Sequence, residues 1–112
     1  MTTPDVSRRL ATYGTLAPGR VNAHQLDALQ GHWSTGVVRG HLKEAGWGAE
    51  KGYPGLIVDA EGPGIEVHLF YSDDLPHFWK TLDTFEGPGY NRVEVMVETA
   101  AGHVAAYIYA LA

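Results

Sequence analysis

The chain of 112 residues contains no cysteine. A disulfide framework, a thiol nucleophile and a thiolate metal site are therefore excluded. The chain has no apolar run long enough to cross a bilayer, which takes about 20 residues. Its first ten residues, MTTPDVSRRL, form no apolar signal region. We expect a protein that has no membrane segment and resides in the cytoplasm.

Positive charge is also scarce, with eight Lys and Arg against thirteen Asp and Glu and a net charge of −5. A protein that binds a phosphate backbone needs a basic face, so no nucleic-acid partner is expected. The six histidines show neither H-x-x-x-H nor H-x-H spacing, and no metal site is predicted. No serine lies in a nucleophile-elbow context, which disfavours a serine hydrolase.

Hydrophobic residues make up 45% of the chain, enough for one globular domain over residues 1–112. Fourteen glycines indicate many tight turns. Alternating and helical periodicities predict an α+β fold, a small mixed β-barrel of about six strands with two or more flanking helices. The strands are expected at Arg8–Tyr13, Trp33–Leu42, Tyr53–Asp59, Ile65–Tyr71, Tyr90–Glu98 and His103–Leu111, and the helices at Val21–Gln30 and Leu75–Phe85.

Within this pattern, Tyr53–Asp59 and Ile65–Tyr71 are interpreted as a strand pair joined around Ala60–Gly64. Gly36 and Gly40 lie within the expected strand Trp33–Leu42 and are interpreted as bulges or kinks. An aspartate, Asp73 or Asp74, is predicted to cap the second helix.

The segment LDTFEGPGYNR at residues 82–92 carries the main chemical signal. At about 100° per residue, Leu75, Trp79, Leu82 and Glu86 fall within about 60° of one another on a helix. Three of these residues favour a core, and the fourth is a carboxylate, which is costly to bury unless it is paired or has a task. Glu86 is therefore the candidate catalytic residue.

The expected surroundings of Glu86 favour a proton-transfer role. Gly87 follows at a position where helices commonly end, so Glu86 would lie in the last turn, at the negative end of the helix dipole. The dipole and burial both raise a carboxyl pKa, which suits a group that exchanges protons near neutral pH. The structural alternatives are a buried glutamate bonded to the backbone or to Arg92, and one that turns to solvent.

Other candidate binding residues lie in three short segments. Tyr13, Gly14, Thr15 and Leu16 form a strand-to-turn junction whose N–H groups can bind a carboxylate, although such junctions are also common structural turns. Tyr53 precedes a proline and is held extended, either as a pocket wall or simply as an entry to a strand. Tyr90 and Arg92 share one face of a strand, where Arg92 can bind Glu86 or a substrate carboxylate, or remain exposed beside Glu94.

In order and spacing, four motifs resemble the gamma-glutamylcyclotransferase-like family from about Leu10 to Leu111: Y-G-T-L-x-P-G, G-Y-P-G-L, L-D-x-F-E-G-x-G-Y-x-R and A-Y-I-Y. The resemblance implies a small mixed barrel and a pocket between the Tyr13–Leu16 loop and Glu86. It also implies that Glu86 is the general acid/base and that the loop binds the glutamyl moiety through backbone N–H groups. One departure is the strand Glu66–Phe70, which lacks the glycine usual for the family near Val67.

The implied activity is conversion of a γ-glutamyl amine or γ-glutamyl amino acid to 5-oxoproline and a free amine, with no cofactor. The expected partner is thus a small γ-glutamyl substrate. A binding module that holds an amino-acid-like ligand without turnover is the alternative, and Glu86 favours the enzyme because a pure binder has little use for a carboxylate in an apolar stripe. Removal of a γ-glutamyl protecting group in a biosynthetic pathway remains open within the enzyme hypothesis.

Overall fold

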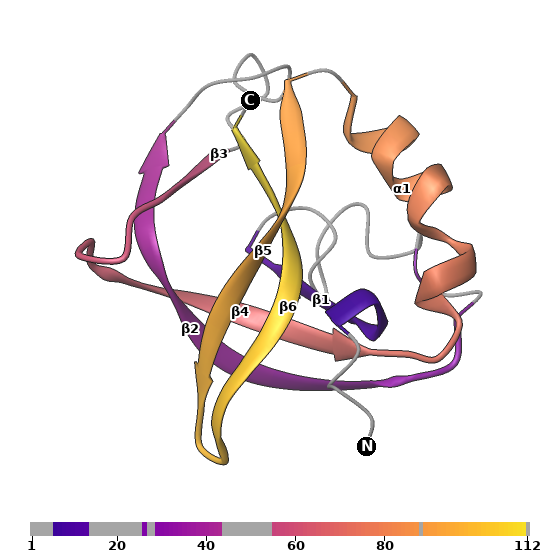
Figure 1. Ribbon diagram of the computed structural model, residues 1–112, viewed down its shortest axis with the longest axis horizontal. Helices are drawn as coiled ribbons and strands as arrows, with labels where there is room; N and C mark the ends of the chain where they lie inside the picture. The colour runs from indigo at the N-terminus through magenta and orange to yellow at the C-terminus, as the bar shows by residue number, and fades with distance from the viewer. Residues whose placement is uncertain (1–5, 14–25, 27–28, 44–54, 88, 112) are drawn as a thin grey trace.

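The computed structural model describes residues 6–13, 26, 29–43, 55–87 and 89–111. Six strands and one α-helix lie within these ranges, which confirms the α+β class (Figure 1). In chain order the elements are the 3-10 turn η1 (Val6–Arg8), β1 (Arg9–Thr12), β2 (His32–Lys43), β3 (Gly55–Val58), β4 (Gly64–Tyr71), the 3-10 turn η4 (Leu75–His77), α1 (Trp79–Glu86), β5 (Tyr90–Thr99) and β6 (Gly102–Leu111).

Five strands close into a barrel. Hydrogen-bonded neighbours run in the order β1-β4-β2-β3-β6, and β6 pairs with β1 to complete the ring. The closing contact is parallel, with Leu10 opposite Tyr107 and Ala11 opposite Ile108. The additional strand, β5, forms a long antiparallel hairpin with β6 and touches β2 where Val37 lies opposite Glu98. This ribbon crosses the middle of the molecule in Figure 1.

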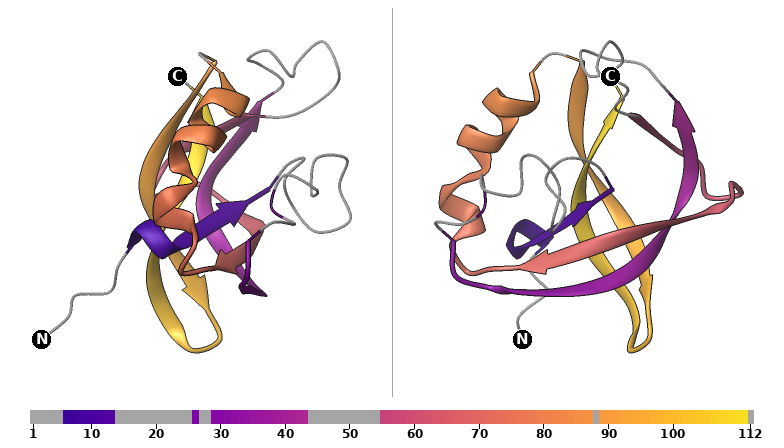
Figure 2. Two further views of the ribbon diagram at one scale, coloured as in Figure 1. Left: turned by 90° about the vertical axis from the view of Figure 1, so that its right-hand side faces the viewer. Right: turned by 180° about the vertical axis from the view of Figure 1, so that it is seen from behind.

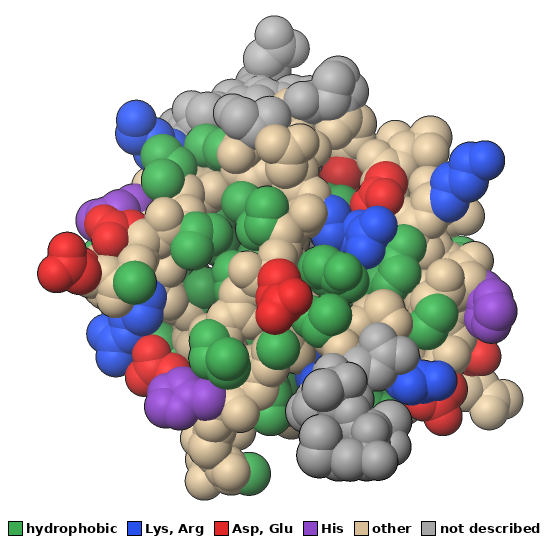
Figure 3. Space-filling view, in the orientation of Figure 1, with side chains coloured by type: hydrophobic (Ala, Val, Ile, Leu, Met, Phe, Trp, Pro, Cys, Tyr) green, Lys and Arg blue, Asp and Glu red, His purple; other side chains and the backbone are tan. Residues whose placement is uncertain are grey.

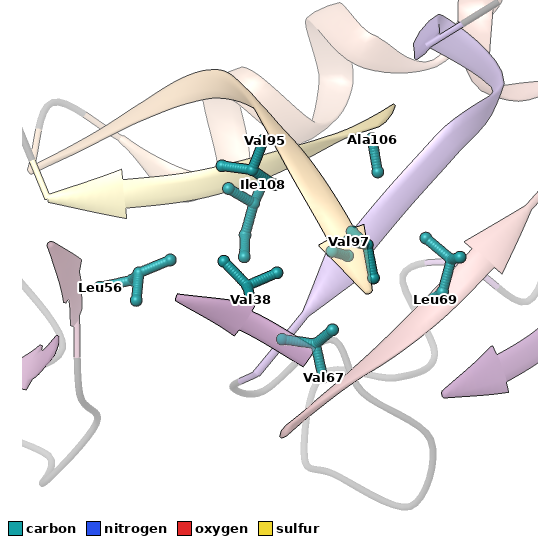
Figure 4. Close-up of a cluster of buried hydrophobic side chains, with 9 residues drawn as sticks. Val38, Leu56, Val67, Leu69, Val95, Val97, Ala106 and Ile108 are labelled. Atoms are coloured by element: carbon teal, nitrogen blue, oxygen red, sulfur yellow. The ribbon is translucent and has the colours of Figure 1, made fainter. Parts of the chain in front are cut away.

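The barrel is filled by small aliphatic side chains. Val38, Leu56, Val67, Val97 and Ile108 are at most 1% exposed and point toward one another from five strands (Figure 4). On β5, Val93, Val95 and Val97 face this core, while Met96 on the other face is 56% exposed. The alternation expected for this strand is therefore confirmed.

A second cluster lies between the barrel and α1, and it positions the helix. Leu10 from β1, Phe70 from β4 and Tyr109 from β6 contribute to this cluster, together with Trp79 and Leu82 from α1. Trp79 also donates its indole N–H to the carbonyl of Ser7 at 2.7 Å. The three orientations in Figures 1 and 2 show α1 lying along one side of the barrel. Some apolar surface stays exposed, and Figure 3 shows hydrophobic side chains gathered around the middle of one face.

The strands β3 and β4 do not pair with each other, so the predicted strand pair is wrong. Both run antiparallel to β2, which lies between them in the sheet. The connecting turn crosses β2 at Gly40, whose N–H binds the Pro63 carbonyl at 3.1 Å. A Cβ on Gly62 would approach the Gly40 backbone to 3.1 Å, so the absence of a side chain at Gly62 eases the crossing.

The glycines of β2 are not bulges. The pairing of β2 with β4 runs without an inserted residue from His32–Tyr71 to Arg39–Gly64, and Gly36 lies opposite Val67. A Cβ on Gly36 would lie 2.5 Å from a methyl carbon of Val97, so glycine here allows β2 and β5 to approach closely. Despite its departure from the family pattern, β4 is a regular strand with Val67 and Leu69 buried.

The segment before α1 differs from the prediction in two details. A 3-10 turn, η4, precedes the helix, which begins only at Trp79. Asp74 occupies the N-cap position of η4 without capping it. Its carboxylate accepts the backbone N–H of Gln30 at 3.0 Å instead, so the predicted cap is wrong in its partner.

Several predicted features lie outside the described residues. They include Gly14, Thr15, Leu16 and Tyr53 of the predicted binding site, and most of the helix expected at Val21–Gln30. Two leucines of this segment, Leu26 and Leu29, lie among the described residues. Leu26 is buried in the cluster beneath α1, and Leu29 packs against it.

Candidate active site

Glu86 is the last residue of α1, as the sequence predicts. Gly87 caps the helix with φ 77°, a left-handed value that favours glycine, and its N–H binds the Asp83 carbonyl at 3.2 Å. The N–H of Tyr90 then binds the Gly87 carbonyl at 3.3 Å, which turns the chain into β5. The site glutamate is thus held at a helix-to-strand corner.

The predicted apolar stripe is present, but it begins at Leu75 in η4 and continues along α1. Leu75, Trp79 and Leu82 are at most 6% exposed, and Glu86 continues their line as a half-buried carboxylate. Burial disfavours the charged form and raises the pKa of Glu86 from 4.5 to about 7. The expected direction of this shift is confirmed, and a carboxyl group with this pKa can both accept and return a proton near neutral pH.

The raised pKa predicts a specific pH dependence of stability. Because folded Glu86 binds its proton more tightly than unfolded Glu86, its contribution to the free energy of unfolding falls as pH rises from about 4.5 to about 7. Glu86→Gln removes this loss, so the variant should gain about 1–3 kcal/mol relative to the parent between pH 4 and pH 8. Urea unfolding at several pH values measures the gain.

Glu66→Gln serves as the control for this titration, because Glu66 is exposed on β4. It replaces a carboxylate by an amide at a position outside the candidate site. A stability difference for Glu86→Gln that does not change with pH would contradict the raised pKa of Glu86.

Tyr13 follows β1 and ties two other strands together. Its hydroxyl donates to the Tyr109 carbonyl on β6 at 2.6 Å and accepts the N–H of Leu56 on β3 at 2.9 Å. Burial raises the pKa of Tyr13, and the negative charge of Glu86 adds to this effect. The Y-G-T-L and G-Y-P-G-L motifs therefore meet through Tyr13 and Leu56, within electrostatic range of the glutamate of the F-E-G motif.

Removal of the Tyr13 hydroxyl should weaken the barrel. Tyr13→Phe leaves the Leu56 N–H and the Tyr109 carbonyl without this partner, and we expect a loss of about 1–3 kcal/mol in the free energy of unfolding. Tyr71→Phe is the matched control, because the Tyr71 hydroxyl makes only a 3.4 Å contact with Asp73. Urea titrations that give both variants equal stability would contradict this bridging role.

Arg92 binds Asp83 rather than standing free beside Glu94. Its Nε and one terminal nitrogen donate to the two Asp83 carboxylate oxygens at 2.9 and 3.2 Å. The guanidinium carbon lies 4.6 Å from the ring centres of both Trp79 and Tyr107. The Tyr109 hydroxyl donates to the same Asp83 carboxylate at 2.7 Å. Partial burial opposes ionisation of Asp83, but these donors hold its pKa below the ordinary value.

The described site residues thus form two connected groups. Glu86 interacts electrostatically with Tyr13. Arg92 and Tyr109 bind Asp83, and the Tyr109 carbonyl accepts the Tyr13 hydroxyl. Sequence reasoning missed Asp83 and Tyr109. A signal for both existed: Asp83 belongs to the L-D-x-F-E-G motif, and Tyr107 and Tyr109 alternate on one face of the closing strand.

The described residues were also compared with what a metal site and a membrane-spanning helix require. In these ranges, no three His, Asp or Glu side chains gather in a way that suits a metal ion. None of the helices found there is long and apolar enough to span a membrane.

A closed five-stranded barrel with one flanking helix that ends in a half-buried carboxylate defines the structural class. The family model described as "Gamma-glutamyl cyclotransferase, AIG2-like" matches residues 10–112. The chain therefore belongs to the AIG2-like gamma-glutamyl cyclotransferase family. No curated protein matches the chain.

Solved structures with the same fold come from distant organisms. YkqA from Bacillus subtilis is 28% identical with a TM-score of 0.72, and the match covers 93% of this chain but 35% of YkqA. This chain thus spans about a third of the length of that protein. An AIG2-like protein from Mus musculus is 21% identical with a TM-score of 0.73, covering 94% of this chain and 77% of the mouse protein. The protein c4763 from uropathogenic E. coli is 24% identical with a TM-score of 0.64, covering 97% and 80% respectively.

Proposed function

We propose that the protein is a cyclotransferase that converts a γ-glutamyl amine or γ-glutamyl amino acid to 5-oxoproline and a free amine. The observation that carries the proposal is the half-buried Glu86 carboxyl, whose pKa is raised to about 7 at the corner between α1 and β5. Membership of the gamma-glutamyl cyclotransferase, AIG2-like family supports the same chemistry.

In the proposed reaction the substrate supplies its own nucleophile. Its α-ammonium group transfers a proton to the Glu86 carboxylate, and the freed amine attacks the γ-carbonyl carbon to close a five-membered ring. The bond from that carbon to the leaving nitrogen then breaks, and Glu86 returns the proton to this nitrogen. The ring nitrogen releases its second proton as it becomes an amide, and the leaving amine takes up one proton to become ammonium. No water, metal or redox partner is consumed.

The protein's remaining task is to hold the substrate in a folded conformation. Ring closure is intramolecular, so correct orientation of the amine and the γ-carbonyl supplies much of the rate enhancement. We assign the glutamyl moiety to the backbone N–H groups of the segment Tyr13–Leu16, which the sequence predicts to be a strand-to-turn junction. Tyr53 and Tyr90 are proposed as further substrate contacts.

The test is release of 5-oxoproline from a panel of γ-glutamyl amines and γ-glutamyl amino acids. We expect release from at least one member, and the preferred leaving group identifies the substrate class. Binding of a panel member without turnover, by a folded protein, supports the alternative of a ligand-binding module. If the folded protein neither binds nor turns over any member of the panel, both assignments are contradicted.

A further inference from the structure

We propose that Asp83, Arg92 and Tyr109 form a clamp that positions Glu86 for proton transfer. They are positioning residues, and this role replaces the direct substrate contact first expected for Arg92. The inference rests on the proposed function for its kinetic part, but its structural part can be tested without turnover.

Arg92 is already bound in a forked contact to Asp83. Two of its nitrogens bind both oxygens of Asp83, and its planar group lies 4.6 Å from the ring centres of Trp79 and Tyr107. A guanidinium with this bidentate partner and these aromatic contacts is fixed in place. Its side chain is only 26% exposed. A substrate carboxylate that took the same forked contact, through Nε and the same terminal nitrogen, would have to displace Asp83.

Asp83 fastens the junction between α1 and β5, where Glu86 lies. Its carbonyl accepts the N–H of Gly87, and its carboxylate binds Arg92 on β5 and Tyr109 on β6. In the sequence, Glu86 lies three residues after Asp83 and directly before Gly87. The last turn of an isolated helix frays readily because its carbonyls lack partners. The clamp fastens this turn to two strands at once.

Tyr109 connects the clamp to Tyr13, a residue of the proposed site. Its hydroxyl binds Asp83, while its carbonyl accepts the Tyr13 hydroxyl at 2.6 Å. Tyr13 and Tyr109 both interact electrostatically with Glu86. Among the described residues, charged or titratable groups therefore face Glu86 from Tyr13 after β1 and from Tyr109 on β6, while Asp83 precedes it by three residues on α1. Movement of the clamp would change the solvation of Glu86 at its end of the helix.

The chain contains a matched control for this clamp. Arg39 on β2 binds Glu98 on β5 with the same forked geometry, at 2.8 and 3.2 Å. Its side chain is 46% exposed, and this pair does not involve α1. Arg39→Lys therefore breaks an equivalent fork without changing the corner at Glu86.

The experiment compares Arg92→Lys with Arg39→Lys. Lysine keeps the positive charge, so the comparison isolates the loss of the fork and of aromatic stacking. With the preferred γ-glutamyl amide, Arg92→Lys should lower kcat about tenfold or more with KM changed less than about twofold, whereas Arg39→Lys should leave both within about twofold. A raised KM with kcat unchanged would instead identify Arg92 as a substrate ligand and overturn the proposal.

A second readout does not require turnover. Carbon-13 NMR follows the titration of the Glu86 carboxyl group, whose signal is assigned by its absence in Glu86→Gln. We expect a midpoint near pH 7 in the parent and in Arg39→Lys, and a midpoint at least one pH unit lower in Arg92→Lys because the loosened turn admits water. An unchanged midpoint in a folded Arg92→Lys protein would overturn the clamp. A shifted midpoint in a chain without turnover would support the clamp and count only against the proposed reaction.

Discussion

Glu86→Gln is expected to reduce 5-oxoproline release about 10³-fold or more while the fold is kept. An amide side chain fills nearly the same volume but cannot accept the proton of the substrate ammonium group. General acid/base catalysis commonly contributes between about 10² and about 10⁴ in rate, and here one residue is assigned both the removal and the return of the proton. The half-buried side chain becomes neutral in the variant, so no charge is left without solvation.

Kinetics and binding together check this result. The loss should appear in kcat, with substrate binding largely kept, since the glutamyl moiety is assigned to backbone groups of another loop. Glu66→Gln on β4 controls for replacement of a carboxylate by an amide on the surface. Activity within a few fold of the parent in Glu86→Gln would remove Glu86 from the mechanism and favour another acid/base group.

Gly40→Ala is expected to lower the free energy of unfolding by about 3 kcal/mol or more. A Cβ at this position would lie 2.4 Å from the backbone oxygen of Ile57 and 2.9 Å from a methyl carbon of Leu56. Backbone of β3 cannot move away without loss of its pairing with β2. Gly40 has no positive φ, so the expected loss reports the steric conflict and not a forbidden backbone conformation.

Gly64→Ala provides the comparison, because its nearest obstacle is a side-chain methyl of Val37 at 2.9 Å, which can rotate. We expect its cost to stay within about 1 kcal/mol. Chemical denaturation of the two variants measures the difference. Equal stabilities would show that the close approach of Gly40 to Leu56 and Ile57 on β3 relaxes easily.

Local patterns in the sequence predicted the parts of the fold that depend on local physics. The alternation of Val93, Val95 and Val97 identified the buried face of β5, and Gly87 identified the end of α1. The crossing of β2 by the turn that connects β3 and β4 could not be predicted from local patterns. It depends on the approach of two glycines, Gly40 and Gly62, from segments that have no shared periodicity.

The candidate site shows the same division. The position of Glu86 on an apolar stripe followed from helical geometry, and burial raises its pKa as expected. The partner of Arg92 did not follow, because Asp83 and Glu86 are both carboxylates near the end of one helix. Only the tertiary arrangement places Arg92, Tyr107 and Tyr109 around Asp83. The binding role of the segment Tyr13–Leu16 and of Tyr53 stays a prediction.

The position of β6 in the sheet has a consequence for how the protein folds. It pairs with β1, β3 and β5, and the bond from Tyr13 to Tyr109 joins positions 96 residues apart. Contacts with such long sequence separation give a high contact order, which slows folding. During synthesis the barrel stays open until this strand leaves the ribosome. Because Tyr109 binds Asp83 and Tyr107 packs against Arg92, we expect the candidate site to assemble only when β6 docks.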